Sequence, residues 1–154
     1  MRILVVGDTH GRISPVLREI KQFRFDYMLF TGDFIADAGN IAKKTGIKYK
    51  GVRGNCDPKT GSEEQVIEMD GKRFYMIHGH QYAVKKSCDL LWQRGMDIGA
   101  DIVVFGHTHK AYCEKRNGLW MINPGSPSYP RASVSTYAVI NINEGKIFPD
   151  IVEF

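Results

Sequence analysis

The chain has little cysteine, and the cysteines it has are not paired. Cys56, Cys88 and Cys113 are widely spaced along the 154 residues and form no CxxC pattern. An odd number of cysteines with this spacing is not typical of a disulfide framework or of a structural zinc knuckle. Because a chain without disulfides suits a reducing compartment, we expect a cytoplasmic protein.

Long hydrophobic runs are also absent. The apolar run at residues 3–6 ends at Gly7 and Asp8, and it is too short for a signal peptide or a membrane span. The sequence contains no repeat, no low-complexity segment and no linker rich in proline, glycine or serine. With 43% hydrophobic residues, a chain of this length can bury a real core. We therefore expect a single domain over residues 1–154, with no membrane partner.

Basic runs longer than two residues are missing as well. The formal net charge of +4 leaves an anionic partner open, but the basic residues are scattered, and Lys43-Lys44 and Lys85-Lys86 are typical of the longest runs. Lysines and arginines on exposed helix faces account for the same balance. Because no basic stripe is interleaved with aromatic residues, we do not expect a nucleic-acid partner.

Short apolar runs rich in β-branched residues are frequent, and they predict buried strands. The clearest runs are residues 3–6, 27–30, 74–77 and 102–105, with a further strand at residues 47–53. Predicted helices span residues 14–24, 40–45 and 84–98. Ser14 is a suitable N-cap before Pro15, and Gly46 is a suitable stop for the second helix.

The carboxyl-terminal part predicts three hairpins, each around a residue followed by glycine. The predicted pairs are residues 65–69 with 71–77, 111–115 with 119–122, and 136–142 with 146–153. Their turns are Asp70-Gly71, Asn117-Gly118 and Glu144-Gly145. Because parallel βα units give way to hairpins, we expect an α/β fold made of mixed β-sheets packed as a sandwich with helices outside.

Seven side chains able to bind a metal fall in five short polar clusters, most of them directly after an apolar run. They are Asp8 and His10, Asp33, Asn55, His78, and His107 with His109. Glycines flank these clusters and allow tight turns. Because ligand sites of open α/β sheets lie at the carboxyl ends of strands, the clusters predict one shared metal site.

Two of the clusters place ligands two residues apart. In an extended chain such residues point to the same face, so Asp8 and His10 are expected to bind together, as are His107 and His109. A site rich in imidazole favours manganese, iron, nickel, cobalt or zinc over magnesium and calcium. The residues do not choose among these transition metals.

Taken in order, the clusters resemble the motif set of the calcineurin-like metallophosphoesterases. The motifs are Asp8-Thr9-His10, Gly32-Asp33, Gly54-Asn55-Cys56-Asp57, His78-Gly79-His80 and Gly106-His107-Thr108-His109. With Asn123-Pro124-Gly125-Ser126, they resemble the small, single-domain YfcE-like phosphodiesterase branch. The resemblance runs from Asp8 to about Ser126, and it implies a four-layer α/β/β/α sandwich of two mixed β-sheets flanked by helices.

The resemblance also implies a dinuclear metal site with Asp33 as the bridge. Asp8, His10, Asp33 and His109 would hold the first ion, and Asp33, Asn55, His78 and His107 the second. It favours manganese as the metal. It further implies a phosphodiesterase that acts on a small phosphodiester, with Asp33, Asn55, Cys56 and Asp57 as the catalytic residues.

The charge of such a site favours a phosphoester. Two divalent ions bring four positive charges and the carboxylates of Asp8 and Asp33 bring two negative ones, which leaves a residual charge of +2. Oxygens of an anionic ester can bridge metals about 3.5 to 4 Å apart. A hydroxide between the metals would be the nucleophile, because metal coordination lowers the pKa of water to roughly 7.

Cys56 departs from the pattern of many members of the superfamily. They carry a histidine there that resembles a general acid for the leaving group, oriented by the next acidic residue, here Asp57. Cysteine at this position is usual in the YfcE-like branch, and a thiol is a poor hydrogen-bond donor. We therefore expect better hydrolysis of aryl phosphodiesters than of alkyl monoesters.

Some alternatives stay open at this point. A retromer subunit of the same family is similar in fold and serves mainly as a surface for protein interactions. The alternative function is therefore a metal-binding scaffold with little catalysis. His80 is either a ligand in place of His78 or a support behind the ligands. Arg131 is either a phosphate contact or a solvated side chain, and a homo-oligomer is possible.

Overall fold

The computed structural model describes residues 1–132 and 134–154 of the chain. Its helices are α1 (Ser14–Gln22), α2 (Ala36–Thr45) and α3 (Asp89–Asp97), with a short 3-10 helix, η1 (His80–Tyr82). The strands are β1 (Arg2–Val6), β2 (Tyr27–Phe30), β3 (Tyr49–Gly51), β4 (Glu64–Met69), β5 (Lys72–Ile77), β6 (Ile102–Val104), β7 (Ala111–Arg116), β8 (Leu119–Pro124), β9 (Thr136–Asn143) and β10 (Lys146–Glu153).

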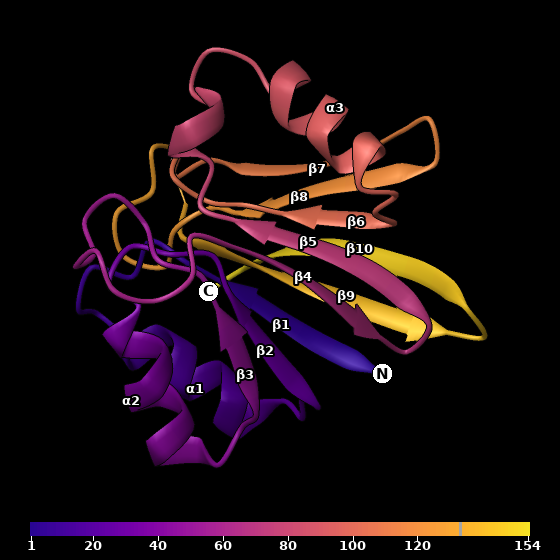
Figure 1. Ribbon diagram of the computed structural model, residues 1–154. Helices are drawn as coiled ribbons and strands as arrows, with labels where there is room; N and C mark the ends of the chain where they lie inside the picture. The colour runs from indigo at the N-terminus through magenta and orange to yellow at the C-terminus, as the bar shows by residue number, and fades with distance from the viewer. Residues whose placement is uncertain (133) are drawn as a thin grey trace.

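Two five-stranded sheets pack face to face, and helices cover their outer faces (Figure 1). The first sheet has the order β10-β9-β1-β2-β3, and the second has the order β4-β5-β6-β8-β7. Both sheets are mixed, because β1-β2-β3 and β5-β6-β8 pair in parallel while their outer neighbours pair antiparallel. The expected α/β/β/α sandwich is confirmed.

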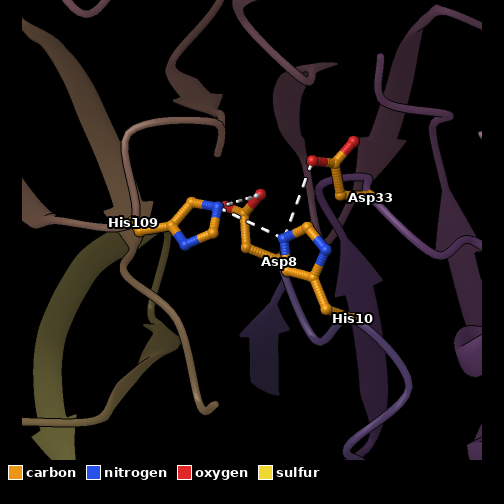
Figure 2. Close-up of side chains that lie close together, drawn as sticks. All are labelled: Asp8, His10, Asp33 and His109. Atoms are coloured by element: carbon orange, nitrogen blue, oxygen red, sulfur yellow. Dashed lines mark hydrogen bonds and ion pairs between the residues drawn. The ribbon is translucent and has the colours of Figure 1, made fainter. Parts of the chain in front are cut away.

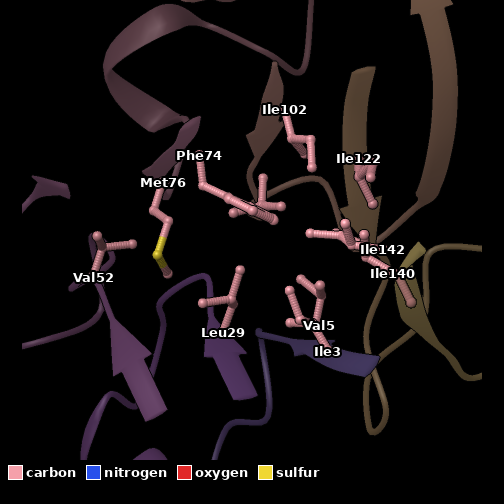
Figure 3. Close-up of a cluster of buried hydrophobic side chains, with 12 residues drawn as sticks. Ile3, Val5, Leu29, Val52, Phe74, Met76, Ile102, Ile122, Ile140 and Ile142 are labelled. Carbon is pink, nitrogen blue, oxygen red and sulfur yellow. The ribbon is translucent and has the colours of Figure 1, made fainter. Parts of the chain in front are cut away.

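The continuous apolar runs arise because the strands are buried on both faces. In β1, Ile3 and Val5 point into the core between the sheets, whereas Leu4 and Val6 face the helices α1 and α2. Figure 3 shows the core between the sheets, where Leu29 of the first sheet lies opposite Phe74 and Met76 of the second. A strand with both faces covered needs apolar residues at every position, which explains the absence of alternation.

The helices differ from the sequence expectation at their ends. In α1, Ser14 lies inside the helix, and Ile13 occupies the N-cap position without a side-chain hydrogen bond. The second helix begins at Ala36, four residues before the expected start, and ends at Gly46 with φ 76° as expected. The third begins at Asp89 and not at residue 84, because the chain first forms a turn in which the Lys86 amide donates to the carbonyl oxygen of Ala83 at 2.8 Å.

All three predicted hairpins are confirmed. Asp70, Asn117 and Glu144 each have φ near 50°, and the glycine that follows each of them also has a positive φ. Two consecutive left-handed residues form the tight turn whose twist matches a two-residue hairpin. In the part of the chain that the structure describes, no helix is long and apolar enough to cross a membrane.

Candidate metal centre

Four side chains from three loops converge beyond the carboxyl ends of β1, β2 and β6. Asp8 and His10 follow β1, Asp33 follows β2, and His109 follows β6. Each offers a ligand atom, and these atoms all lie within 4.8 Å of one another. Figure 2 shows the carboxylates and rings of this group, which we call the first half-site, pointing toward a common space. The structure thus brings together four of the predicted ligands.

The distances within the first half-site fit a shared cation. The Nε2 atoms of His10 and His109 are 3.3 Å apart, and His109 Nε2 lies 3.5 Å from Asp8 Oδ1. Two nitrogens that each lie about 2.0 to 2.1 Å from one ion in tetrahedral geometry would be separated by about 3.3 Å. Asp8 Oδ1 is buried and has no hydrogen-bond partner among the described residues. A buried carboxylate oxygen of this kind requires a cation or a proton.

Backbone carbonyls orient two of the histidines. His109 Nδ1 lies 2.7 Å from the carbonyl oxygen of Tyr129, and His78 Nδ1 lies 2.8 Å from the carbonyl oxygen of Thr31. Each Nδ1 must therefore donate its proton, which leaves a lone pair on Nε2. His78 Nε2 is buried and has no hydrogen-bond partner among the described residues, so its lone pair is available for a ligand.

The two oxygens of Asp33 face different histidines. Oδ2 lies 3.8 Å from His10 Nε2, while Oδ1 lies 3.4 Å from His78 Nε2. The amide of Cys56 also donates to Oδ1, at 2.9 Å. Asp33 is almost fully buried, so its side chain is held in place between two groups of possible ligands.

A second group of imidazoles lies on the Oδ1 side of Asp33. The ring of His78 lies 5.0 Å from that of His107 and 5.5 Å from that of His80, measured between centroids. The rings of His80 and His107 are 5.9 Å apart. We call His78 and His107, with Asn55, the second half-site. His80 borders it, and its buried Nδ1 has no hydrogen-bond partner among the described residues.

The structure places Asn55, Cys56 and Asp57 on one exposed turn beside Asp33. Asn55 Nδ2 donates to Cys56 Sγ at 3.4 Å, so in this conformation the Asn55 side chain contacts the thiol. The carboxylate of Asp57 accepts from the amides of Gly54 and Ile35, each at 2.8 Å. Asp57 therefore fixes the turn to the start of α2, and its oxygens are already engaged by the backbone.

The backbone at the ligands is left-handed, which corrects the expectation of an extended chain. Asp8, His10, Asp33, His107 and His109 all have φ between 46° and 69°. Such conformations cost about 1 to 3 kcal/mol each and cluster at functional sites. They also separate residues that an extended chain would place on one face: His109 joins the first half-site, whereas His107 lies with His78.

Two glycines of the motifs are required by close approach. A Cβ on Gly54 would lie 2.1 Å from Asp33 Oδ1, and a Cβ on Gly106 would lie 2.9 Å from Asp8 Oδ2. A side chain at either position would displace a carboxylate. The glycines therefore let the loops close around Asp8 and Asp33.

Asp37 is a functional residue that the sequence reasoning missed. Its buried Oδ2 accepts from Thr9 Oγ1 at 2.6 Å and from the Gly11 amide at 2.9 Å, so it holds the loop that carries Asp8 and His10. Asp37 lies in the first turn of α2, ahead of the helix start predicted at residue 40. The available signal in the sequence was that Asp37 is the one acidic residue among the mostly apolar residues 34–39.

The segment Asn123–Ser126 supports the site from behind. Ser126 Oγ donates to the carbonyl oxygen of Asp8 at 2.8 Å, and Asn123 Nδ2 donates to the carbonyl oxygen of Gly106 at the same distance. Both side chains are fully buried. Asn123 and Pro124 end β8, so this segment is not a turn but connects the end of the strand to the loops of the first half-site.

Burial controls the ionisation of the site. It raises the pKa of Asp8 well above its usual value, and the nearby Asp33 raises it further. Burial also favours the neutral form of Asp33, but His78 and the Cys56 amide outweigh this and lower its pKa. Burial and the neighbouring His78 lower the pKa of His107 to about 4. The imidazole is therefore neutral at pH 7, the form that binds metal.

The comparisons with known proteins identify the class of the chain. The family model for the calcineurin-like phosphoesterase superfamily domain matches residues 1–145. The chain therefore belongs to this superfamily, as its motifs and its two-sheet sandwich indicate.

Particular relatives agree with this class. The probable metallophosphoesterase YsnB of Bacillus subtilis strain 168 is 30% identical over 146 residues, covering 92% of this chain and 85% of the relative. Phosphodiesterase YfcE of Escherichia coli K12 is 26% identical, covering 85% and 82%. The crystal structure of Vps29 from Entamoeba histolytica complexed with Zn²⁺ matches with a TM-score of 0.81 at 24% identity, over 99% of both chains. That similarity shows the shared fold.

Proposed function

We propose that the protein is a dinuclear metal-dependent phosphodiesterase. The observation that carries the proposal is the position of Asp33, whose Oδ2 faces His10 and whose Oδ1 faces His78. A carboxylate with two sets of neutral imidazole ligands on opposite sides is suited to bridge two cations.

The donor set fits two divalent transition metals, with manganese as the proposed ion. Asp8, His10, Asp33 and His109 would hold one ion, and Asp33, Asn55, His78 and His107 the other. The buried and unpartnered Asp8 Oδ1 and His78 Nε2 support this fit, one in each half-site. When bound, the two ions would bind phosphate oxygens and lower the pKa of a shared water to roughly 7.

The chain itself supplies charge and alignment. With the ions bound, Asp8 and Asp33 would contribute two negative charges, and the imidazoles of His78, His107 and His109 are held neutral, since burial lowers the pKa of each. The site thus keeps a positive excess for an anionic ester. The left-handed loops and the hydrogen bonds that Asp37 accepts from Thr9 and Gly11 fix the ligands before substrate binds. This limits reorganisation during the reaction.

The groups beside the metals favour esters with good leaving groups. Loss of solvent around the sulfur and the nearby Asp33 raise the pKa of Cys56 to about 11, so the thiol stays protonated but remains a weak donor. Asp57 is engaged by the backbone. Because this turn supplies no strong general acid, we propose small aryl-type phosphodiesters as preferred substrates. The name of the E. coli relative, a phosphodiesterase, supports diesters.

The test is an activity screen on protein reconstituted with Mn²⁺, Zn²⁺, Co²⁺ or Ni²⁺. The panel contains aryl phosphodiesters, cyclic nucleotides, nucleotide diesters and phosphomonoesters. Asp33→Asn should lose activity by about 10³-fold or more, since two-metal stabilisation amounts to several kcal/mol. The matched control is Asp150→Asn, which changes an exposed carboxylate on β10 and should leave activity unchanged.

Two outcomes would contradict the proposal. Undiminished activity of Asp33→Asn would show that Asp33 does not bridge metals. Tight metal binding without turnover on any member of the panel would instead favour the metal-binding scaffold.

A further inference from the structure

A cavity of about 670 Å³ lies beside the metal centre and is not needed to hold the metals. Three cationic side chains border it, Lys85 from the segment before α3, Lys110 from the loop before β7, and Arg131 from the loop before β9. Its apolar lining includes Val84 and Phe105, both buried in the core between the second sheet and α3. The cavity thus combines an apolar floor with a basic rim.

The cavity adjoins the ligands directly. Thr108, which contributes to its lining, stands between His107 and His109 in the sequence. Arg131 lines both this cavity and a second hollow of about 570 Å³ that is bordered by His10 and His109. The amide of Arg131 also donates to the carbonyl oxygen of His109 at 2.9 Å. A ligand at the metals can therefore extend past Arg131 into the cavity.

The three cations of the rim are exposed side chains without a direct ion pair in the described part of the chain. Among the described residues, no ion pair joins Lys85, Lys110 or Arg131 to a carboxylate, and no acidic side chain lines the cavity. Three unpaired cations around one cavity form a site for an anion. Arginine in particular suits carboxylate and phosphate, because its planar fork can donate two parallel hydrogen bonds.

The cavity is larger than the scissile group requires. Volumes of about 300 to 1,000 Å³ are typical of pockets for whole small molecules. The scissile phosphoryl group would occupy the metals themselves, so the cavity is available for the remainder of the substrate. Its floor suits a carbon skeleton or ring, and its rim suits an anionic group.

We propose that this cavity binds a second anionic group of the substrate. The substrate class is then a phosphodiester that carries a phosphate or carboxylate several bonds away from the scissile phosphorus, joined to it by an apolar or aromatic spacer. The inference rests on the proposed phosphodiesterase function and names the substrate feature that the same site selects.

The test uses three diesters that share a 4-nitrophenyl leaving group. Their other ester group is a phenylethyl unit whose para position bears a phosphate, a carboxylate or a neutral carboxamide. With the metal-reconstituted enzyme, each anionic ester should show a kcat/KM about 10- to 100-fold above that of the carboxamide, because charged groups strengthen hydrogen bonds. The phosphate and carboxylate arms distinguish the two kinds of anion.

The variants locate the effect. Lys85→Ala combined with Lys110→Ala should remove most of the preference for the anionic esters. Adding Arg131→Ala, which gives a triple variant, should weaken the preference further. The matched control is Lys86→Ala, which removes an exposed lysine adjacent to Lys85 that does not line the cavity, and it should keep the full preference. Calorimetric binding of the corresponding non-hydrolysable phosphonates to the metal-loaded protein gives a second readout, with the same expected order.

The outcomes separate the two proposals. Equal kcat/KM for all three esters, with equal binding of the three phosphonates, would overturn the anion site while leaving the phosphodiesterase intact. Tighter binding of the anionic phosphonates without turnover of any ester would support the anion site and contradict the phosphodiesterase. A preference that persists in the triple variant would also overturn the assignment to this cavity.

Discussion

The two half-sites share Asp33 but differ in charge and in support. The first contains both buried carboxylates, Asp8 and Asp33, and the structure places its four ligand atoms within 4.8 Å of one another. The second adds only neutral ligands to Asp33, and Asn55 contacts Cys56 in the conformation described. A cation is attracted more strongly where two carboxylates meet.

The half-site with two carboxylates is also the one whose loop is held by more buried side chains. The loop of the first half-site is held by Asp37, and Ser126 holds the carbonyl of Asp8. In the second half-site, Thr31 fixes His78, while Asn55 lies on an exposed turn. We therefore expect two metal sites of unequal affinity, with the first half-site filled first.

The largest expected effect comes from removing one histidine from either half-site, in two separate variants. His109→Ala should weaken the tight site, whereas His107→Ala should retain one tightly bound ion and lose the second. Both should lower kcat by about 10³-fold, because a single ion cannot clamp the ester. Metal analysis by native mass spectrometry alongside kinetics checks the pair. Equal metal loss in both variants would show that the half-sites are not distinct.

Replacing Cys56, on the turn that carries Asn55, tests how the second half-site sets the preference for leaving groups. We expect Cys56→His to raise kcat/KM for alkyl diesters by about 10²-fold, since a general acid contributes about that much or more, and to leave aryl diesters nearly unchanged. The control is Cys113→His, at an exposed cysteine on β7. An equal change on aryl and alkyl esters would show that the missing imidazole does not set the preference.

Removing Asp37, which holds the loop that carries Asp8 and His10, should have a smaller effect. Asp37→Ala leaves the donors of Thr9 and Gly11 unpaired, and it should weaken the tight metal site by about 10- to 100-fold, as is typical of residues behind metal ligands. Affinity at the second half-site should change less. Asp97→Ala, in α3, is the control for loss of an acid from a helix. If calorimetry finds both affinities unchanged, Asp37 has only a structural role.

The smallest expected effect is the pH dependence of the metal-free protein. The pKa of His107 is about 4 in the folded state and about 6.5 when unfolded, so the unfolded chain binds the proton more readily. The resulting stability is present above pH 6.5 and is lost as the pH falls toward 4. Thermal unfolding should show a smaller acid-induced decrease in Tm for His107→Gln than for the wild type. An identical decrease would show that His107 is not held neutral by the fold.

The sequence predicted the parts of the fold that depend on local chemistry. The pairs Asp70-Gly71 and Asn117-Gly118 favour left-handed backbone by themselves, so their hairpins could be placed correctly. Buried strands were also evident from their apolar runs. Helix ends were less accurate: the predicted helix over 84–98 begins only at Asp89, because its first residues form a turn that follows the left-handed Ala83.

The sequence indicated the residues of the site but not its internal geometry. The separation of His107 from His109 depends on left-handed backbone at both residues, so the two-residue spacing predicted it wrongly, whereas the family resemblance implied it. Asp37 was missed because its partners, Thr9 and Gly11, lie 26 to 28 residues away. Contacts between residues this far apart in the sequence depend on how the loops after β1 and β2 meet.

The most direct test of the bridge is a Mn²⁺ titration of the metal-free wild type and of Asp33→Asn, followed by calorimetry and native mass spectrometry. Two ions should bind to the wild type with separate affinities, the tighter one first. Asp33→Asn should bind at most one ion, and more weakly, because both half-sites lose a shared ligand. Two ions bound to Asp33→Asn with unchanged affinities would contradict the assignment of Asp33 as the bridge.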